Sequence, residues 1–183
     1  MPHRPQARPS VRARFSCEYC SRRRCDVGGV GVDVKILDLS AGNRHIWYDK
    51  AHPLATFVDV RAEVNPDIVA DTRRLPPVIG EGYNLIVFDP PHCNFGKTSR
   101  MAKDYGHHTS SEIRSIVAET SREAYRVSAP DALMAFKWNT HDQKLEKILG
   151  LMKDHWEPLF GHIVSAPQRR PSTTYWVMLR RLP

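Results

Sequence analysis

Short apolar runs, each bounded by turn-forming residues, recur along the chain and predict β-strands. The clearest run spans residues 83–88 and is rich in β-branched and aromatic types. It is too short for a helix, and this composition is typical of a buried parallel strand. Weaker versions of the same pattern predict further strands at 33–39, 55–60, 67–70, 131–138, 157–164 and 173–181.

Apolar residues at helical spacing predict two helices among these strands. The first is capped by Ser110 or Ser111 and continues to about residue 127. Its apolar face is formed by Ile113, Ile116, Val117, Ala124 and Val127. The second covers 142–155, with its inward side formed by Leu145, Ile148, Leu149 and Met152. Residues 43–50 leave room only for a short helix, because a proline follows at position 53.

The last two predicted strands are separated only by residues 165–172, a loop too short to contain a helix. They are therefore expected to form an antiparallel, hairpin-like pair. The earlier strands alternate with helices or longer connections, as parallel sheets require. These elements predict an α/β fold with a seven-stranded doubly wound sheet, and 183 residues suffice for one domain with a full-sized core.

The run at 83–88 ends abruptly in Asp89, Pro90 and Pro91. Two prolines fix φ, remove two backbone donors and force the residue before each into an extended conformation. The strand cannot continue and no helix can start, so a carboxylate is held at the carboxyl end of a strand. Ligands bind at that edge of open α/β sheets. The plainer interpretation is a strand followed by a proline turn with an ordinary aspartate.

Three more aspartates fall at predicted strand ends. Asp38 precedes a small turn that contains Gly42, and a glycine there lets the backbone approach a cofactor closely. Asp59 follows about 20 residues later at the end of the second strand, where a carboxylate can accept both hydroxyls of a ribose. Asp71 follows the third strand.

The Asp-Pro-Pro segment resembles the Asp-Pro-Pro-aromatic motif of class I S-adenosylmethionine-dependent methyltransferases that act on planar amino groups, chiefly the exocyclic amine of adenine. Segments 36–42, 57–61, 66–71 and 136–139 stand in the order found in small bacterial and phage adenine methyltransferases. The resemblance covers roughly residues 33–181 and implies a Rossmann-like sheet with an antiparallel last strand. The fourth motif position is usually Tyr, Phe or Trp, and here it is His92.

The resemblance also implies roles for individual residues. It assigns the reaction to Asp89, Pro90, Pro91 and His92. It assigns S-adenosylmethionine binding to Asp38, Ser40, Ala41, Gly42, Asp59, Val60, Asp71 and Thr72. The target amine is expected to donate hydrogen bonds to the Asp89 carboxylate and to the Pro90 carbonyl, while the ring of His92 stacks on a flipped-out base. Trp138, at the end of the fifth strand, is either a second stacking platform or a core residue.

Two alternatives to adenine methylation stay open. One is a methyltransferase for another nitrogen, such as that of cytosine, a ring nitrogen or a protein glutamine. The other is a nucleic-acid-binding module that keeps the fold without turnover. The four acids at four strand ends argue against the module, because an unused site has no physical reason to retain them.

The N-terminal region differs in charge from the rest. The net charge is +7 and the pI near 9.4, and seven arginines against one glutamate give about +6 before residue 26. We therefore expect a basic, partly disordered extension at 1–30 and a methyltransferase domain at 31–183. The extension favours a nucleic-acid partner, DNA or RNA, although basic tails also act as solubilisers. The chain is too short for a large target-recognition domain, so the tail, short loops or a recognition partner protein must supply target choice.

Three of the four cysteines lie close together, at Cys17, Cys20 and Cys25. A Cys-x2-Cys pair with a third cysteine can hold one structural zinc, with Cys93 or a histidine as fourth ligand. Free or partly buried thiols are the alternative. No apolar run is long enough for a membrane span or a signal peptide, so a cytoplasmic location without membrane contact is expected. Residues 94–108 are polar and predict a substrate-facing lid or a plain surface loop. The sequence does not indicate an oligomeric state.

Overall fold

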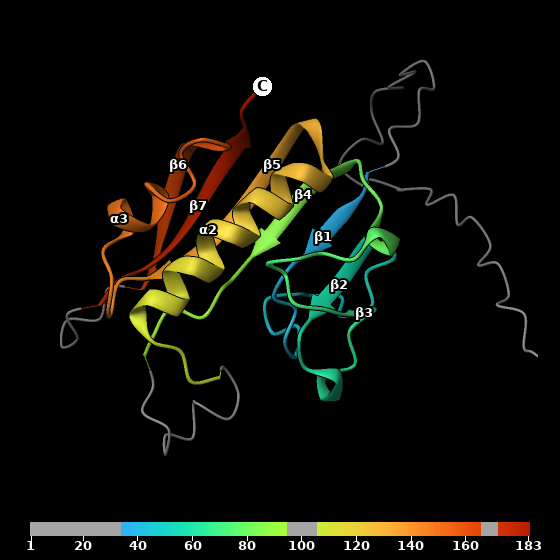
Figure 1. Cartoon of the computed structure of the whole chain (residues 1–183), viewed down its shortest axis with the longest axis horizontal. Helices are drawn as coiled ribbons and strands as arrows, with labels where there is room; N and C mark the ends of the chain where they lie inside the picture. The colour runs from blue at the N-terminus through green and yellow to red at the C-terminus, as the bar shows by residue number, and fades with distance from the viewer. Residues whose placement is uncertain (1–33, 95–105, 166–171) are drawn as a thin grey trace, which may run out of the picture. The chain divides into compact units, whose positions relative to one another are not determined.

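The computed structural model describes residues 34–94, 106–165 and 172–183. Residues 34–183 form one α/β unit around a seven-stranded sheet of order β3-β2-β1-β4-β5-β7-β6 (Figure 1). The chain winds outward in both directions from β1 and β4. β1 to β5 are parallel, and β7 is antiparallel to both β5 and β6. The predicted doubly wound sheet with an antiparallel last strand is confirmed.

The strands are β1 (Ile36–Asp38), β2 (Ala55–Asp59), β3 (Ile68–Val69), β4 (Tyr83–Phe88), β5 (Ser128–Asn139), β6 (Trp156–Ser165) and β7 (Thr174–Arg181). The helices are α2 (Ser110–Val127) and α3 (Leu145–Leu149), with short 3-10 turns η2 (Ala62–Val64) and η3 (Pro77–Ile79). β4 has the bounds that its apolar run predicts. β1 and β3 are shorter than predicted, and β5 begins three residues earlier, directly after α2.

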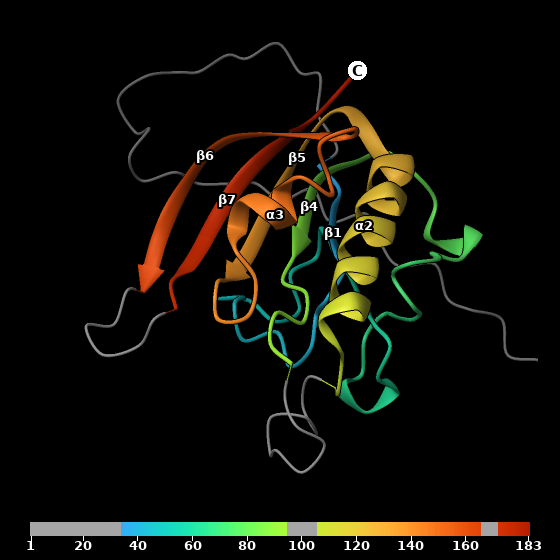
Figure 2. The ribbon, with the colours of Figure 1, turned by 60° about the vertical axis from the view of Figure 1, so that its left-hand side comes forward.

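The long helix α2 is positioned by a capping box. The N-cap is Thr109 rather than Ser110 or Ser111, because the Thr109 hydroxyl accepts the backbone N–H of Glu112 while the Glu112 carboxylate accepts that of Thr109. The helix lies across one face of the sheet over β4 and β5 (Figures 1 and 2).

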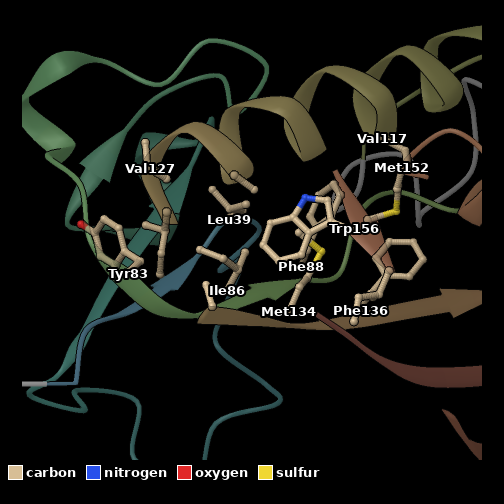
Figure 3. Packing of buried hydrophobic residues seen from close by; sticks show 14 of the residues in the cluster. Leu39, Tyr83, Ile86, Phe88, Val117, Val127, Met134, Phe136, Met152 and Trp156 are labelled. Carbon is tan, nitrogen blue, oxygen red and sulfur yellow. The ribbon is translucent and has the colours of Figure 1, made fainter. Parts of the chain in front are cut away.

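The apolar core lies between α2 and the sheet (Figure 3). Alternate residues of β5, including Met134 and Phe136, point toward α2 and are fully buried, as the two-residue period of a strand requires. Trp156 closes the core from the start of β6, and its indole N–H donates to the Ser121 carbonyl of α2 at 2.9 Å. This packing fixes β4, and therefore its carboxyl end, against a rigid layer.

The predicted short helix at 43–50 is wrong, since these residues form turns. Arg44 has a left-handed φ of 56°, which interrupts any helix. Its guanidinium lies 3.9 Å over the ring of Phe57 and donates to the Asn65 carbonyl, and Trp47 packs edge-on against the same ring at 5.0 Å. Tertiary contacts with β2 therefore outweigh local helix formation here.

The predicted helix at 142–155 is also too long, because only α3 is helical. Gln143 is buried and bonded to α2: its side-chain carbonyl accepts from Arg114, and its amide donates to the Ser110 carbonyl. These contacts hold residues 141–143 in a bend, and the backbone is extended only at Lys144, directly before α3. Gly150 and the turns that follow end it, although Met152 is fully buried, as predicted.

Several predictions fall outside the described residues, namely the basic extension at 1–30, the cysteines at 17, 20 and 25, and most of the predicted lid at 94–108. None of the helices in the described part of the chain is both long and apolar enough to cross a membrane.

Candidate active site

The carboxyl ends of β1 and β4 lie side by side at the point where the winding of the sheet reverses. Two hydrogen bonds join the turn after β1 to the exit of β4. The Leu39 N–H donates to the Val87 carbonyl at 3.0 Å, and the Asp89 N–H donates to the Ser40 hydroxyl at 2.7 Å. The two turns that the sequence singles out therefore form one site, at the position where open α/β sheets bind ligands.

Asp38 is the most deeply buried acid of this site, with 1% of its surface exposed. Its carboxylate accepts the Ser40 N–H at 3.0 Å and the Trp47 indole N–H at 2.6 Å. Burial raises the pKa of Asp38 from 3.8 to about 6, and the charges of Asp89 and Asp59 act in the same direction, while the two hydrogen bonds oppose the shift. A cationic ligand beside this carboxylate would favour its charged form.

Asp59, at the end of β2, is held by the turn after β1. One carboxylate oxygen accepts the Gly42 N–H at 2.8 Å, and the other accepts the Arg61 N–H at 2.9 Å and its guanidinium at 3.2 Å. Gly42 has a φ of 48°, and a Cβ there would lie 3.3 Å from the Arg61 side chain. Glycine therefore allows the close approach of turn and carboxylate.

Asp89 leaves β4 with its backbone bonded to Ser40 and its side chain paired with Lys137 of β5, whose Nζ lies 2.6 Å from Oδ2. Both side chains are partly exposed, at 20% and 25%. Among the described residues, Oδ1 of Asp89 has no hydrogen-bond partner.

His92 folds back over the Asp-Pro-Pro turn, with its Nδ1 atom 3.2 Å from the Pro90 carbonyl oxygen. A carbonyl only accepts, so Nδ1 carries the proton in this contact and Nε2 of the neutral ring is an acceptor. Burial lowers the pKa of His92. The ring also meets Trp138 edge-on at a centroid distance of 6.1 Å.

Trp138 belongs to the core rather than to an open platform. It is fully buried, stacks on Phe136 at 6.0 Å and donates its indole N–H to the Gln143 carbonyl at 3.0 Å. Of the two interpretations of this residue, the core one is correct, and its edge supports the ring of His92.

The other predicted cofactor residues are not hydrogen-bonded to this group of aspartates in the described part of the chain. Ala41 is buried in the turn after β1, whereas Val60 is 67% exposed. Asp71 pairs with Arg73 on the surface at 2.6 Å, and the hydrogen bonds from Arg73 lower the pKa of Asp71. The Thr72 hydroxyl lies 3.0 Å from that of Thr120 on α2. The structure thus joins Asp38, Ser40, Gly42, Asp59 and Asp89 directly, but not Asp71 or Thr72.

One group of possible metal ligands occurs among the described residues, with donor atoms within 4.8 Å of one another: Cys93, His141 and Asp142. Asp142 already accepts hydrogen bonds from the His141 ring at 2.7 Å and from the Asn94 N–H at 2.5 Å. Burial raises the pKa of Cys93 to about 11, which favours the thiol over the metal-binding thiolate. The group is a hydrogen-bonded cluster with a weak donor set.

No protein-family profile matches the sequence, and no curated protein matches it. Solved structures do match. The N-methyltransferase NodS of Bradyrhizobium japonicum WM9, solved with S-adenosyl-L-homocysteine, is 11% identical over 82% of this chain and 79% of its own, with a TM-score of 0.52. The chain has the Rossmann-like methyltransferase fold.

Two RNA-modifying enzymes give similar values. An rRNA methylase of Streptococcus thermophilus is 13% identical over 82% of this chain and 89% of its own, with a TM-score of 0.52. The 16S rRNA (adenine(1408)-N(1))-methyltransferase of Catenulisporales acidiphilia is 12% identical over 82% and 86%, with a TM-score of 0.55. At these identities the likeness is one of fold.

Three residues of the site are absent from the sequence-based assignment: Trp47, Arg61 and Lys137. Each is a partner of a predicted aspartate, at Asp38, Asp59 and Asp89 respectively. Only Lys137 left a signal in the sequence, as a charged residue inside a strand that is otherwise apolar near its end. A lysine there needs a partner or an exit to solvent.

Proposed function

We propose that this protein is an S-adenosylmethionine-dependent methyltransferase that methylates the exocyclic amine of adenine in DNA or RNA. The observation that carries the proposal is the Asp89-Pro90-Pro91-His92 turn, bonded through Ser40 to the glycine-bearing turn after β1. The methyltransferase fold and the buried acids Asp38 and Asp59 beside that turn support the proposal.

The donor set fits S-adenosylmethionine. Asp59 would accept the ribose hydroxyls, and Asp38 would face the cationic part of the cofactor, where a positive charge offsets the burial of its carboxylate. The turn from Ser40 to Gly42 supplies backbone with little side-chain bulk. The Arg61 guanidinium occupies the Asp59 carboxylate in this structure, so a bound ribose would have to displace it.

When bound, the cofactor supplies a methyl group on a positively charged sulfur. Transfer to an amine is an in-line displacement, for which positioning contributes much of the rate. Asp89 Oδ1 and the Pro90 carbonyl would accept the two N–H groups of the amine, and the carboxylate can take the proton that the methylated nitrogen releases. The Pro90 carbonyl oxygen accepts a hydrogen bond from His92 with one of its two lone pairs, and the second lone pair remains for the target amine.

The nucleic-acid partner is supported by the basic N-terminal extension at 1–30, and target choice would come from that extension, from short loops or from a partner protein. We therefore propose that the chain is divided into this extension and a methyltransferase domain at 31–183.

Tritium transfer from labelled S-adenosylmethionine to DNA, rRNA, tRNA and protein fractions, followed by nucleoside analysis, tests the proposal. N6-methyladenine is the expected product, and it is lost in Asp89→Ala while cofactor affinity is retained, because this carboxylate acts mainly in the transition state. Asp131→Ala is the matched control, since Asp131 is an exposed acid on β5. Label in a ring nitrogen, cytosine or glutamine would overturn the choice of target. If no fraction carries label, the proposal that this protein is a methyltransferase is overturned.

A further inference from the structure

We infer that Lys137 is a positioning residue: it holds one oxygen of the Asp89 carboxylate so that the other faces the target amine. This inference rests on the proposed function, because it assigns a role within the same site. Lys137 acts through Asp89 and is not assigned a contact with the target or with the cofactor.

The register of the sheet brings the two side chains together. β4 and β5 are parallel, with Phe88 opposite Phe136, so Asp89 and Lys137 follow as neighbours at the carboxyl edge. Phe136 and Trp138 point into the core, and Lys137 therefore points to the opposite face of the sheet. There its Nζ atom lies 2.6 Å from Asp89 Oδ2.

The other two acids of the site are held differently. Asp38 accepts hydrogen bonds from Ser40 and Trp47, and Asp59 is paired with Arg61. Lys137 lies on the strand next to β4 and adds no ion pair to either of them among the described residues. Its charge is therefore directed at the carboxylate of the Asp-Pro-Pro turn.

Three contacts then leave the Asp89 carboxylate one orientation. The backbone N–H is bonded to Ser40, the following peptide is fixed by Pro90, and Oδ2 is held by Lys137. Oδ1 has no hydrogen-bond partner among the described residues, so it is the oxygen left for a target N–H. A carboxylate held in place loses less rotational freedom in the transition state than a free one, and small displacements of a catalytic group cost large factors in rate.

Kinetics of three variants test this role. Lys137→Met removes the charge at similar length, Lys137→Arg keeps it, and Lys153→Met removes an exposed lysine from the turns after α3 as the matched control. We expect Lys137→Met to lower kcat by about 10- to 100-fold with cofactor affinity within about twofold of wild type. Lys137→Arg recovers most of kcat, and Lys153→Met leaves it unchanged. An unchanged kcat in Lys137→Met, or a loss confined to KM or cofactor affinity, would overturn the inference.

A second measurement needs no turnover. The side-chain ammonium of Lys137 is observed by proton–nitrogen NMR, and its signal is assigned by its loss in Lys137→Met. The protons of a hydrogen-bonded ammonium group exchange slowly with water, which keeps its signal visible. Asp89→Asn removes the charged acceptor, so this exchange should become faster and the signal should broaden or disappear. If the signal is the same in Asp89→Asn, the inference fails whatever the activity. If the wild type transfers no methyl group to any fraction but the signal responds to Asp89→Asn, the proposed function fails and the ion pair stands.

Discussion

The contribution of the buried Asp38 carboxyl group to the stability of this protein should fall as the pH rises from about 4 to about 7. Its pKa is 3.8 when exposed and about 6 in the folded chain, chiefly because burial disfavours the charged form. Between these values Asp38 binds more protons in the folded state than in the unfolded state, so its contribution to the free energy of unfolding decreases with pH. Substitution Asp38→Asn removes the titration while keeping a similar shape.

The magnitude follows from the size of the shift. About two pKa units, at 1.36 kcal/mol each, correspond to about 3 kcal/mol. Solvent screening reduces this little, because only 1% of the residue is exposed. The Asn variant also carries a penalty, since its amide group faces either the Ser40 N–H or the Trp47 indole N–H, both of which are donors. That penalty does not depend on pH.

Urea unfolding of the wild type and of Asp38→Asn at intervals from pH 4 to pH 7.5 measures the effect. The difference between the two free energies of unfolding should change by about 3 kcal/mol across this range, in favour of the variant at high pH. Carboxyl groups with lowered pKa values, such as Glu123, act in the opposite direction but cancel in the difference. Two curves that stay parallel at every pH would refute the reasoning.

Four further predictions concern ligand binding, turnover and metal content. Asp59→Ala should remove two charge-assisted hydrogen bonds to the ribose and weaken S-adenosylmethionine binding by about 2–4 kcal/mol, or about 30- to 700-fold. Calorimetry measures this loss, and an unchanged affinity in a folded variant would place the cofactor elsewhere. If the ring at position 92 stacks on a base, His92→Ala should lower kcat about ten- to hundredfold, while His92→Tyr and His92→Phe should retain it. An equal loss of kcat in all three variants, with a wild-type rate that falls toward acid pH, would instead make His92 a proton acceptor. Deleting residues 1–27 should weaken nucleic-acid binding and flatten its dependence on salt, and an unchanged salt slope would reduce the tail to a solubiliser. Metal analysis of the full chain should find about one zinc if Cys17, Cys20 and Cys25 bind it, and near zero if they are free thiols.

The parts of the fold that the sequence predicts well are those with a strong local pattern. β4 is a mostly apolar run that ends before the Asp-Pro-Pro turn, and α2 has a regular apolar face from Ile113 to Val127, so both end where predicted. The local pattern fails to predict the secondary structure where contacts with residues distant in the sequence determine the backbone conformation. Trp47 and Arg44 pack on Phe57 instead of continuing a helix, and no short-range signal in residues 43–50 indicates that contact.

The site shows the same division. Each aspartate at a strand end is visible in the sequence, because strand and turn patterns place it. The partner of each aspartate depends on the register between strands, which the sequence of one strand does not specify. Asp89 meets Lys137 only because Phe88 lies opposite Phe136. Thr72 likewise points to Thr120 of α2, although its position after β3 suggested a cofactor contact.

The hydrogen bond from the Asp89 N–H to the Ser40 hydroxyl has a consequence for ligand binding at this edge of the sheet. Ser40 belongs to the turn proposed to receive the cofactor, and Asp89 to the turn proposed to receive the target. We expect a ligand that orders the first turn to order the second through this bond; the two binding equilibria are then coupled, and each ligand strengthens the binding of the other by the same factor. Because the coupling is reciprocal, one serine hydroxyl favours the complex that holds both ligands without fixing which of them binds first.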